Sequence, residues 1–345
     1  MAVSVVIISK NEAGRLRLAL ASYDAAVAKA AAVRIDTEII VVNDGSSDDT
    51  IEVLEQYAGA LPLKVVHNTS SVGIAHARNR GAAAAAGDIL LFMDGDVLIG
   101  PEAIVAHAER HRERGRRTIV RGASAYLRCT RPFLDPQTGT PFPGQEAAVA
   151  RMGNKLPDSL VTIEHVRHRF DTIEARARPG IYIGSIHADL YAAEIEALEK
   201  DGRPDVCWMT VPGHNVSVPK ADFAAVGGYD GQQLPIENRE LGLRLCARGL
   251  DVVYAKRARS YHLAHQGQGR DPLTGRPDWI TAFYGKHQSL AAKLMLIFWH
   301  GLARSTAIPE AARIDSILHL ARILRDGSTY DYERLFRNLV AASAP

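Results

Sequence analysis

The chain has 345 residues, 47% of them hydrophobic, and carries a formal net charge of +2 at pH 7. This size allows one large domain or two ordinary ones, and the nearly neutral charge gives no indication of a nucleic-acid partner. No apolar run reaches the roughly 20 residues that a membrane-spanning helix needs, so no transmembrane segment is expected. The three cysteines, Cys129, Cys207 and Cys246, show no metal or disulfide spacing, and the chain opens without the leader of a secreted protein. We therefore expect a cytoplasmic protein.

Apolar, β-branched strands alternate with helical segments over residues 3–127. The predicted strands span residues 3–8, 38–42, 63–66, 89–93 and 118–127. The predicted helices end near residues 33 and 57 and span residues 73–86 and 101–117. This alternation favours an α/β fold with a mostly parallel sheet and helices on both faces. The last helix has a basic face that we expect to be solvated, formed by His107, Arg110, His111, Arg114 and Arg117.

The second half of the chain is predicted to contain helices at 157–178, 188–199 and 238–248, a strand near 251–254, and a helical region from Trp279 to the end. The segment Gly267–Asp278 is rich in glycine and proline and is expected to form a loop that closes over a ligand. The apolar stripe around Leu294–Trp299 is expected to form core or a homodimer contact rather than a membrane contact.

Two carboxylates, Asp94 and Asp96, follow the strand 89–93 with only Gly95 between them. Close carboxylates repel each other and lose hydration, so a cation beside them is favoured, and oxygen ligands suit a hard divalent ion. A turn in which both side chains hydrogen-bond the backbone is the alternative. Because ligands of α/β sheets bind at the carboxyl ends of the strands, we predict a ligand site at this edge.

Further motifs accompany this pair in a characteristic order. They are Asn43-Asp44-Gly45-Ser46, Gly73 to Gly81, Gly227-Gly228-Tyr229-Asp230, Glu237-Asn238-Arg239-Glu240 and Tyr261-His262-Leu263-Ala264-His265. Together they resemble the nucleotide-sugar glycosyltransferases of the GT-A fold, specifically family 2. The resemblance covers about residues 3–265 and implies a Rossmann-like enzyme that moves a sugar from a UDP-sugar to an acceptor. It implies a nucleotide-binding half, 1–127, and an acceptor- and sugar-binding half, 128–278, followed by a helical extension, 279–345.

The resemblance also assigns roles to residues of the nucleotide-binding half. Asp44 matches the acidic residue that pairs with the uracil ring N–H, and Arg78 matches an arginine near the base and diphosphate, where a fixed cationic fork is physically sensible. Ser9 and Glu12 match the first loop of the family, which touches the nucleoside. Capping of a helix is the alternative for Asp44, Ser9 and Glu12, and an exposed helix position is the alternative for Arg78.

Asp94 and Asp96 match the metal motif of the family. The resemblance implies that Asp96 ligates Mn²⁺ or Mg²⁺, while Asp94 and Gly95 contact the donor. His262 matches a histidine that often supplies a further ligand, which tilts the choice towards manganese because imidazole is a softer donor than oxygen. His265 is the competing candidate for that position.

The segment Glu237-Asn238 departs from the usual Glu-Asp pair, whose second acid deprotonates the acceptor. Asn238 cannot take a proton, so Glu237, or else Glu240, is expected to act as the base of an inverting reaction. The segment also resembles the polypeptide N-acetylgalactosaminyltransferases, which retain configuration, so a retaining transferase acting on a peptide or natural product remains open. A helix start complemented by the charge of Glu237 is the structural alternative.

Trp208 and His214 precede these motifs and are candidates for contacts with the donor. An indole can lie against a sugar face, although a packed tryptophan is the alternative. The acceptor stays unspecified among peptides, glycans and small natural products. Two other classes remain: a sugar-phosphate nucleotidyltransferase, which would need a glycine-rich loop that Ser9–Gly14 lacks, and a non-catalytic nucleotide-sugar-binding protein, which the departure at Asn238 would support.

Overall fold

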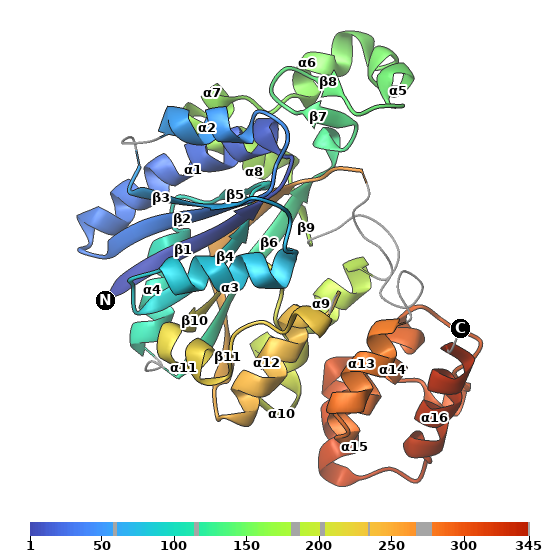
Figure 1. Cartoon of the computed structure of the whole chain (residues 1–345). Helices are drawn as coiled ribbons and strands as arrows, with labels where there is room; N and C mark the ends of the chain where they lie inside the picture. The colour runs from blue at the N-terminus through green and yellow to red at the C-terminus, as the bar shows by residue number, and fades with distance from the viewer. Residues whose placement is uncertain are drawn as a thin grey trace.

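The computed structural model describes residues 1–57, 61–113, 117–180, 187–200, 204–233, 235–266 and 278–343. The strands of the main sheet are β1 (Ala2–Ser9), β2 (Asp36–Asp44), β3 (Leu63–Asn68), β4 (Ile89–Asp94), β5 (Val97–Ile99), β6 (Thr118–Leu127), β9 (Arg178–Pro179), β10 (Val216–Pro219) and β11 (Asp251–Leu263). Their order is β3-β2-β1-β4-β10-β6-β11-β5, with β9 paired to β6 (Figure 1). A separate hairpin pairs β7 (Phe133–Asp135) with β8 (Thr140–Pro141).

Helices cover the sheet, and further helices follow it at the C-terminal end of the chain. The first half contains α1 (Ala13–Ala32), α2 (Thr50–Tyr57), α3 (Ile74–Ala84) and α4 (Ala103–Glu113). The middle contains α5 (Glu146–Ala150), α6 (Leu156–Ser159), α7 (Ile163–His168), α8 (Phe170–Arg176), α9 (His187–Lys200), α10 (Pro204–Cys207), α11 (Lys220–Ala225) and α12 (Glu237–Ala247). The last described helices are α13 (Asp278–Lys286), α14 (Leu290–Leu302), α15 (Ile317–Asp326) and α16 (Tyr332–Ser343).

The predicted α/β fold is confirmed, and its central strands β1 and β4 bury both of their faces. Successive residues of a strand point to opposite faces, and here Val5 and Ile7 of β1 join the hydrophobic cluster under α1, whereas Val6 joins the cluster under α3. A strand that is covered on both faces needs a continuous apolar run, which is the pattern seen in the sequence. In Figure 1, α1 and α3 lie on opposite faces of β1, β2 and β4.

The parallel part of the sheet gives way to antiparallel strands at β10. The pairs β1–β2, β1–β4, β2–β3 and β6–β11 are parallel, whereas β10 is antiparallel to both β4 and β6. The sequence did not predict β10, whose four residues end in proline. The expected strand at 251–254 continues to Leu263 past a register shift between Ala255 and Arg259. This extension carries His262 to the edge of the sheet where Asp96 lies.

The single helix predicted at 157–178 is instead three short helices. Thr162 begins α7, because its hydroxyl accepts a hydrogen bond from the backbone N–H of His165 in a capping box. Arg169 ends that helix with a φ of −137°, which is outside the helical region. Local capping therefore overrides the longer helical pattern.

The predicted solvated face of α4 is wrong for His107 and His111, which are 0% and 1% exposed. Ser217 Oγ lies 2.8 Å from both His107 Nδ1 and His111 Nε2. The Nε2 atom of His107 lies 3.0 Å from Asn215 Oδ1. Burial lowers the pKa of His107 to about 4 and that of His111 to about 3. Both rings are therefore neutral parts of a hydrogen-bonded chain beneath β10.

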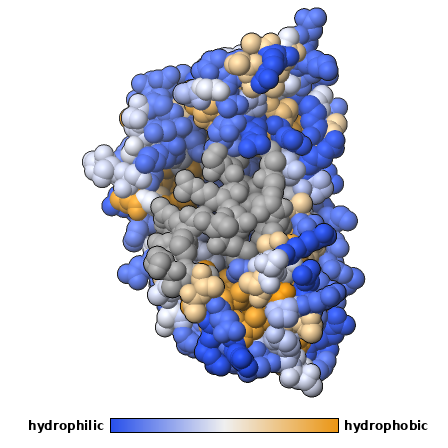
Figure 2. All heavy atoms as spheres, turned by 90° about the vertical axis from the view of Figure 1, so that its right-hand side faces the viewer, coloured by the Kyte–Doolittle hydropathy of each residue, from blue (hydrophilic) through white to orange (hydrophobic). Residues whose placement is uncertain are grey.

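The apolar stripe of α14 is core, which confirms one of the expected alternatives. Leu294, Leu296 and Trp299 are 0–1% exposed and belong to the same hydrophobic cluster as Trp208 and Phe92. Figure 2 views the side that carries α13–α16: most of it is hydrophilic, and apolar side chains gather toward its lower end. Among the described residues, no helix is both long enough and apolar enough to cross a membrane.

Candidate active site

The loop after β1 and the turn after β4 meet at Gly95. Gly95 N–H donates to the carbonyl of Ile8 over 2.8 Å. A Cβ atom at this position would lie 2.8 Å from Ser9 Oγ and 3.1 Å from Glu12 Oε2, so only glycine permits this approach. Burial, reinforced by the charges of Asp96 and Asp94, raises the pKa of Glu12 well above its usual value. The sequence motifs in these two loops therefore form one acidic cluster.

Asp96 is enclosed by the two histidines that the sequence offered as alternatives. It is 4% exposed, and its Oδ2 atom lies 2.9 Å from His262 Nε2 and 3.1 Å from His265 Nε2. The pairing of β5 with β11 brings them together, and Leu263 N–H donates to the carbonyl of Asp96. Although burial opposes its charge, the two histidines hold the pKa of Asp96 well below its usual range.

These three side chains fit a divalent cation. Their ligand atoms all lie within 4.8 Å of one another. Neighbouring ligands of a six-coordinate cation with bonds of about 2.1 Å lie about 3 Å apart, which matches the two distances from Asp96. One carboxylate and two imidazoles suit a transition metal such as manganese better than magnesium.

Arg78 links the acidic cluster to Glu237, the residue expected to act as the base. This arginine on α3 is 3% exposed. Its Nη2 atom donates to Asp94 Oδ1 and its Nη1 atom donates to Glu237 Oε1, both over 2.9 Å. Burial raises the pKa of Asp94, but Arg78 and His214 together lower it below its usual value. The alternative of an exposed helix residue is therefore wrong for Arg78.

Four buried polar atoms around this ion pair have no hydrogen bond to any described residue: Ser9 Oγ, Arg78 Nε, His214 Nε2 and Tyr229 OH. His214 is 1% exposed, and its Nδ1 atom lies 3.6 Å from Asp94 Oδ2. Buried polar groups are normally paired in folded proteins. A polar ligand at this place would supply the missing partners.

Asp44 is already fully engaged by the protein. Its Oδ1 atom accepts from Asn68 and from the Val72 N–H, and its Oδ2 atom accepts from Ser71 and from the Gly73 N–H, over 2.7–3.1 Å. Burial raises its pKa, but the four hydrogen bonds together lower it. Asp44 therefore holds the end of β2 to the loop before α3, and its expected pairing with uracil remains a prediction.

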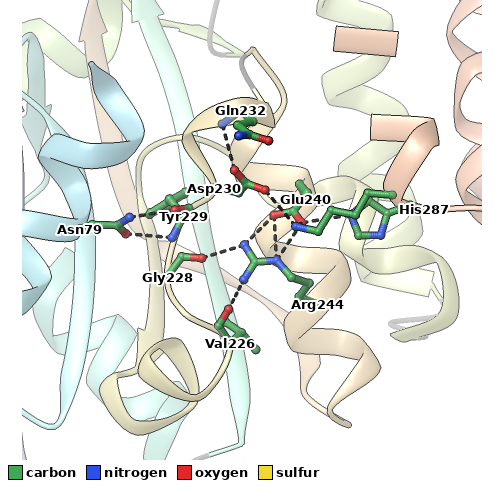
Figure 3. Close-up of polar contacts among 10 residues, drawn as sticks. Asn79, Val226, Gly228, Tyr229, Asp230, Gln232, Glu240, Arg244 and His287 are labelled. Atoms are coloured by element: carbon green, nitrogen blue, oxygen red, sulfur yellow. Dashed lines mark hydrogen bonds and ion pairs between the residues drawn. The ribbon is translucent and has the colours of Figure 1, made fainter. Parts of the chain in front are cut away.

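Glu240 lies away from the acidic cluster, although it is on the same helix as Glu237. It is 0% exposed, and its carboxylate contacts Arg244, Lys286 and His287 (Figure 3). Burial opposes its charge, yet hydrogen bonds from His287, Arg244 and Lys286 lower its pKa to about 2. The carboxylate accepts hydrogen bonds from Arg244, Lys286 and His287 and ties α12 to α13. This engagement argues against Glu240 as the base, and its role in catalysis stays a prediction.

Trp208 is packed in the core, which matches the structural alternative to a contact with a sugar. It is 1% exposed and stacks on Phe283 with ring centroids 6.4 Å apart. Its Nε1–H donates to the carbonyl of Asp205 over 3.2 Å. Asn238 is also internal, since its Nδ2 atom donates to the carbonyl of Val211. The predicted loop Gly267–Asp278 falls outside the described residues except for Asp278, where α13 begins.

Arg15 was not among the site residues expected from the sequence, yet it supports the strand end next to His262. It is 2% exposed and donates to the backbone carbonyls of Leu263, Leu134 and Phe133. Leu263 directly follows His262, so Arg15 fixes the end of the strand that carries His262. An arginine in the apolar first turns of a helix was the available signal.

Comparison with known proteins supports the resemblance. Residues 4–143 match the family model described as Glycosyl transferase family 2, which confirms the resemblance in that part of the chain. Validoxylamine A glucosyltransferase of Streptomyces hygroscopicus subsp. jinggangensis (strain 5008) is 28% identical over 300 residues, covering 86% of this chain and 63% of that protein. The protein of the same name from subspecies limoneus is 28% identical over 268 residues, which cover 76% of this chain and 52% of that protein.

The chain thus spans about half to three-fifths of the length of these relatives. Among solved structures, the crystal structure of S. aureus TarS superposes with a TM-score of 0.51 at 13% identity. The match covers 99% of this chain and 55% of that one. At this identity the likeness concerns the fold alone.

Proposed function

We propose that this chain is a metal-dependent glycosyltransferase that moves a sugar from a UDP-sugar to an acceptor hydroxyl. The observation that carries the proposal is the convergence of Asp94, Asp96, His262 and His265 at the carboxyl edge of the sheet, beside the buried Arg78. The match of residues 4–143 to glycosyl transferase family 2 supports it independently.

Asp96, His262 and His265 would hold the cation, and their donor set favours Mn²⁺ over Mg²⁺. When bound, the cation would act as a Lewis acid that offsets negative charge on the departing diphosphate. Arg78 places a fixed positive charge next to the same corner, held by Asp94. Ser9, Glu12 and Gly95 would form the wall against the nucleoside, as the approach of their loops supports.

Glu237 is the base that the geometry favours for deprotonating the acceptor. It begins α12 and is 5% exposed, and Arg78 contacts its Oε1 atom. Its Oε2 atom has no hydrogen bond from the described residues. A base opposite the leaving group gives inversion, so the anomeric configuration of the product, read by NMR, tests this role. Retention of the anomeric configuration would exclude Glu237 as the base.

The relatives suggest which substrates to try first. Validoxylamine A glucosyltransferases match most of this chain, so UDP-glucose and validoxylamine A form the first donor and acceptor pair. The decisive assay measures UDP release from a panel of UDP-sugars, with Mn²⁺ or with chelator. We expect slow, Mn²⁺-dependent release from one donor, faster with an acceptor. Pyrophosphate release from UTP and a sugar phosphate would instead indicate a nucleotidyltransferase, and no turnover of any donor would indicate a binding protein.

A further inference from the structure

Tyr229 lies in the loop between α11 and α12, next to the proposed donor site. Its side chain is 3% exposed, and its hydroxyl has no hydrogen bond among the described residues. Leaving a buried hydroxyl unpaired costs stability, whereas a phenylalanine at the same place would not incur this cost. The hydroxyl therefore needs an explanation other than packing.

Side chains from two helices hold the loop that carries Tyr229 (Figure 3). Asn79 on α3 donates from Nδ2 to the carbonyl of Tyr229 and accepts at Oδ1 from its N–H, both over 2.8 Å. Arg244 on α12 donates to the carbonyls of Gly228, over 2.7 Å, and Val226, over 2.5 Å. The loop is thus held at Tyr229 itself and at the residues just before it.

The clamp extends to the C-terminal helices. Lys286 at the end of α13 pairs with Asp230 and with Glu240, each over 2.9 Å. Glu240 in turn holds Arg244. The buried carboxylate that was expected to be a base therefore fixes the loop that presents Tyr229.

The ring of Tyr229 is held as firmly as its backbone. Phe92 meets it edge-on with centroids 5.2 Å apart, and Phe223 lies 5.7 Å away. The guanidinium of Arg78 lies 5.3 Å from the ring centroid. With backbone and ring both held, the hydroxyl oxygen has a defined position close to the positive charge of Arg78.

The phenol keeps its proton in this environment. Burial raises the pKa of Tyr229 above its ordinary value; the charge of Arg78 opposes this shift, and the charges of Glu237 and Asp94 add to it. A protonated phenol donates one hydrogen bond. An acceptor oxygen of a bound ligand would therefore satisfy the unpaired hydroxyl.

We propose that the Tyr229 hydroxyl donates a hydrogen bond to an oxygen of the nucleotide-sugar donor, which makes Tyr229 a donor-binding residue. The inference rests on the proposed function, because it concerns the same site. The acceptor is a diphosphate oxygen or a sugar hydroxyl; the adjacent guanidinium of Arg78 favours the former, because anionic oxygens make the stronger hydrogen bonds.

Tyr229→Phe removes the hydroxyl and keeps the ring. The melting temperature of the ligand-free protein and the affinities for UDP and for UDP-glucose, each with Mn²⁺, are measured by calorimetry. We expect a ligand-free protein as stable as wild type or more so, and an affinity for UDP-glucose about tenfold lower, the value of one hydrogen bond. An equal loss for UDP assigns the contact to the diphosphate, and a loss for UDP-glucose alone assigns it to the sugar.

The matched control is Tyr57→Phe on α2, which removes a hydroxyl that donates to the carbonyl of Arg17 over 3.0 Å. It should lower the melting temperature slightly and leave both affinities unchanged. Unchanged affinities in Tyr229→Phe, with a wild type that binds, would overturn the role of Tyr229 alone. A wild type that binds neither nucleotide would overturn the proposed donor, and the role of Tyr229 with it.

Discussion

Replacing Arg78 with methionine tests whether the buried ion pairs hold this site together. The substitution keeps a long side chain but removes the charge that pairs with Asp94 and Glu237, whose side chains are 25% and 7% exposed. Removing one partner of a buried pair leaves an uncompensated charge and costs about 3–5 kcal/mol. We expect that loss in the free energy of unfolding, measured in urea because guanidinium ions would screen the charges.

Two further variants make the result specific. Arg110→Met removes the same charge from an ion pair with Glu113 whose side chains are 39% and 56% exposed, and should cost no more than about 1 kcal/mol. Adding Glu237→Gln to Arg78→Met removes the stranded charge and should restore about 1 kcal/mol or more. If Arg78→Met cost no more than Arg110→Met, the description of Arg78 as the centre of a buried ion network would be refuted.

Three other predictions concern acid stability and catalysis. Burial lowers the pKa of His107 to about 4 and that of His111 to about 3, from 6.5. The unfolded chain therefore binds protons first as the pH falls, and the stability present above pH 6.5 should be lost between about pH 6.5 and 3. His107→Gln should flatten that loss in thermal melts recorded across this range, and an unchanged pH dependence would contradict it. Glu237→Gln should lower kcat for transfer by about 100-fold or more, with the affinity for UDP nearly kept. Glu240→Gln should lower the melting temperature and keep kcat within about tenfold; the reverse order of the two kcat values would return the base role to Glu240.

Most strands and helices of the first half were predictable because each depends on a local pattern, whereas the three-residue strand β5 was missed. The runs that became β1, β2 and β4 are continuous and apolar, since both faces of the sheet are covered. The strand β10 lacks such a signal: it has four residues and is defined by its neighbours β4 and β6. Short strands are therefore the part of this fold that local reasoning misses.

Long-range contacts explain the errors on individual side chains. The sequence places His107 on a basic helix face that was expected to be solvated. Its hydrogen-bond partner Ser217, however, lies 110 residues further along the chain. The sequence suggested Glu240 as a possible base, but Lys286 at the end of α13 and His287 just after it both contact its carboxylate. The pairing of Asp96 with His262 spans 166 residues, and only the resemblance to a known family placed them in one site before the structure did.

The most direct test of the account is a crystal structure of the protein with UDP and Mn²⁺, recorded with anomalous scattering from manganese. The account predicts a manganese peak bonded to Asp96, His262 and His265, in contact with the diphosphate. A peak elsewhere, or a nucleotide bound away from this corner while Asp96 and His262 keep their 2.9 Å contact, would contradict the proposed function.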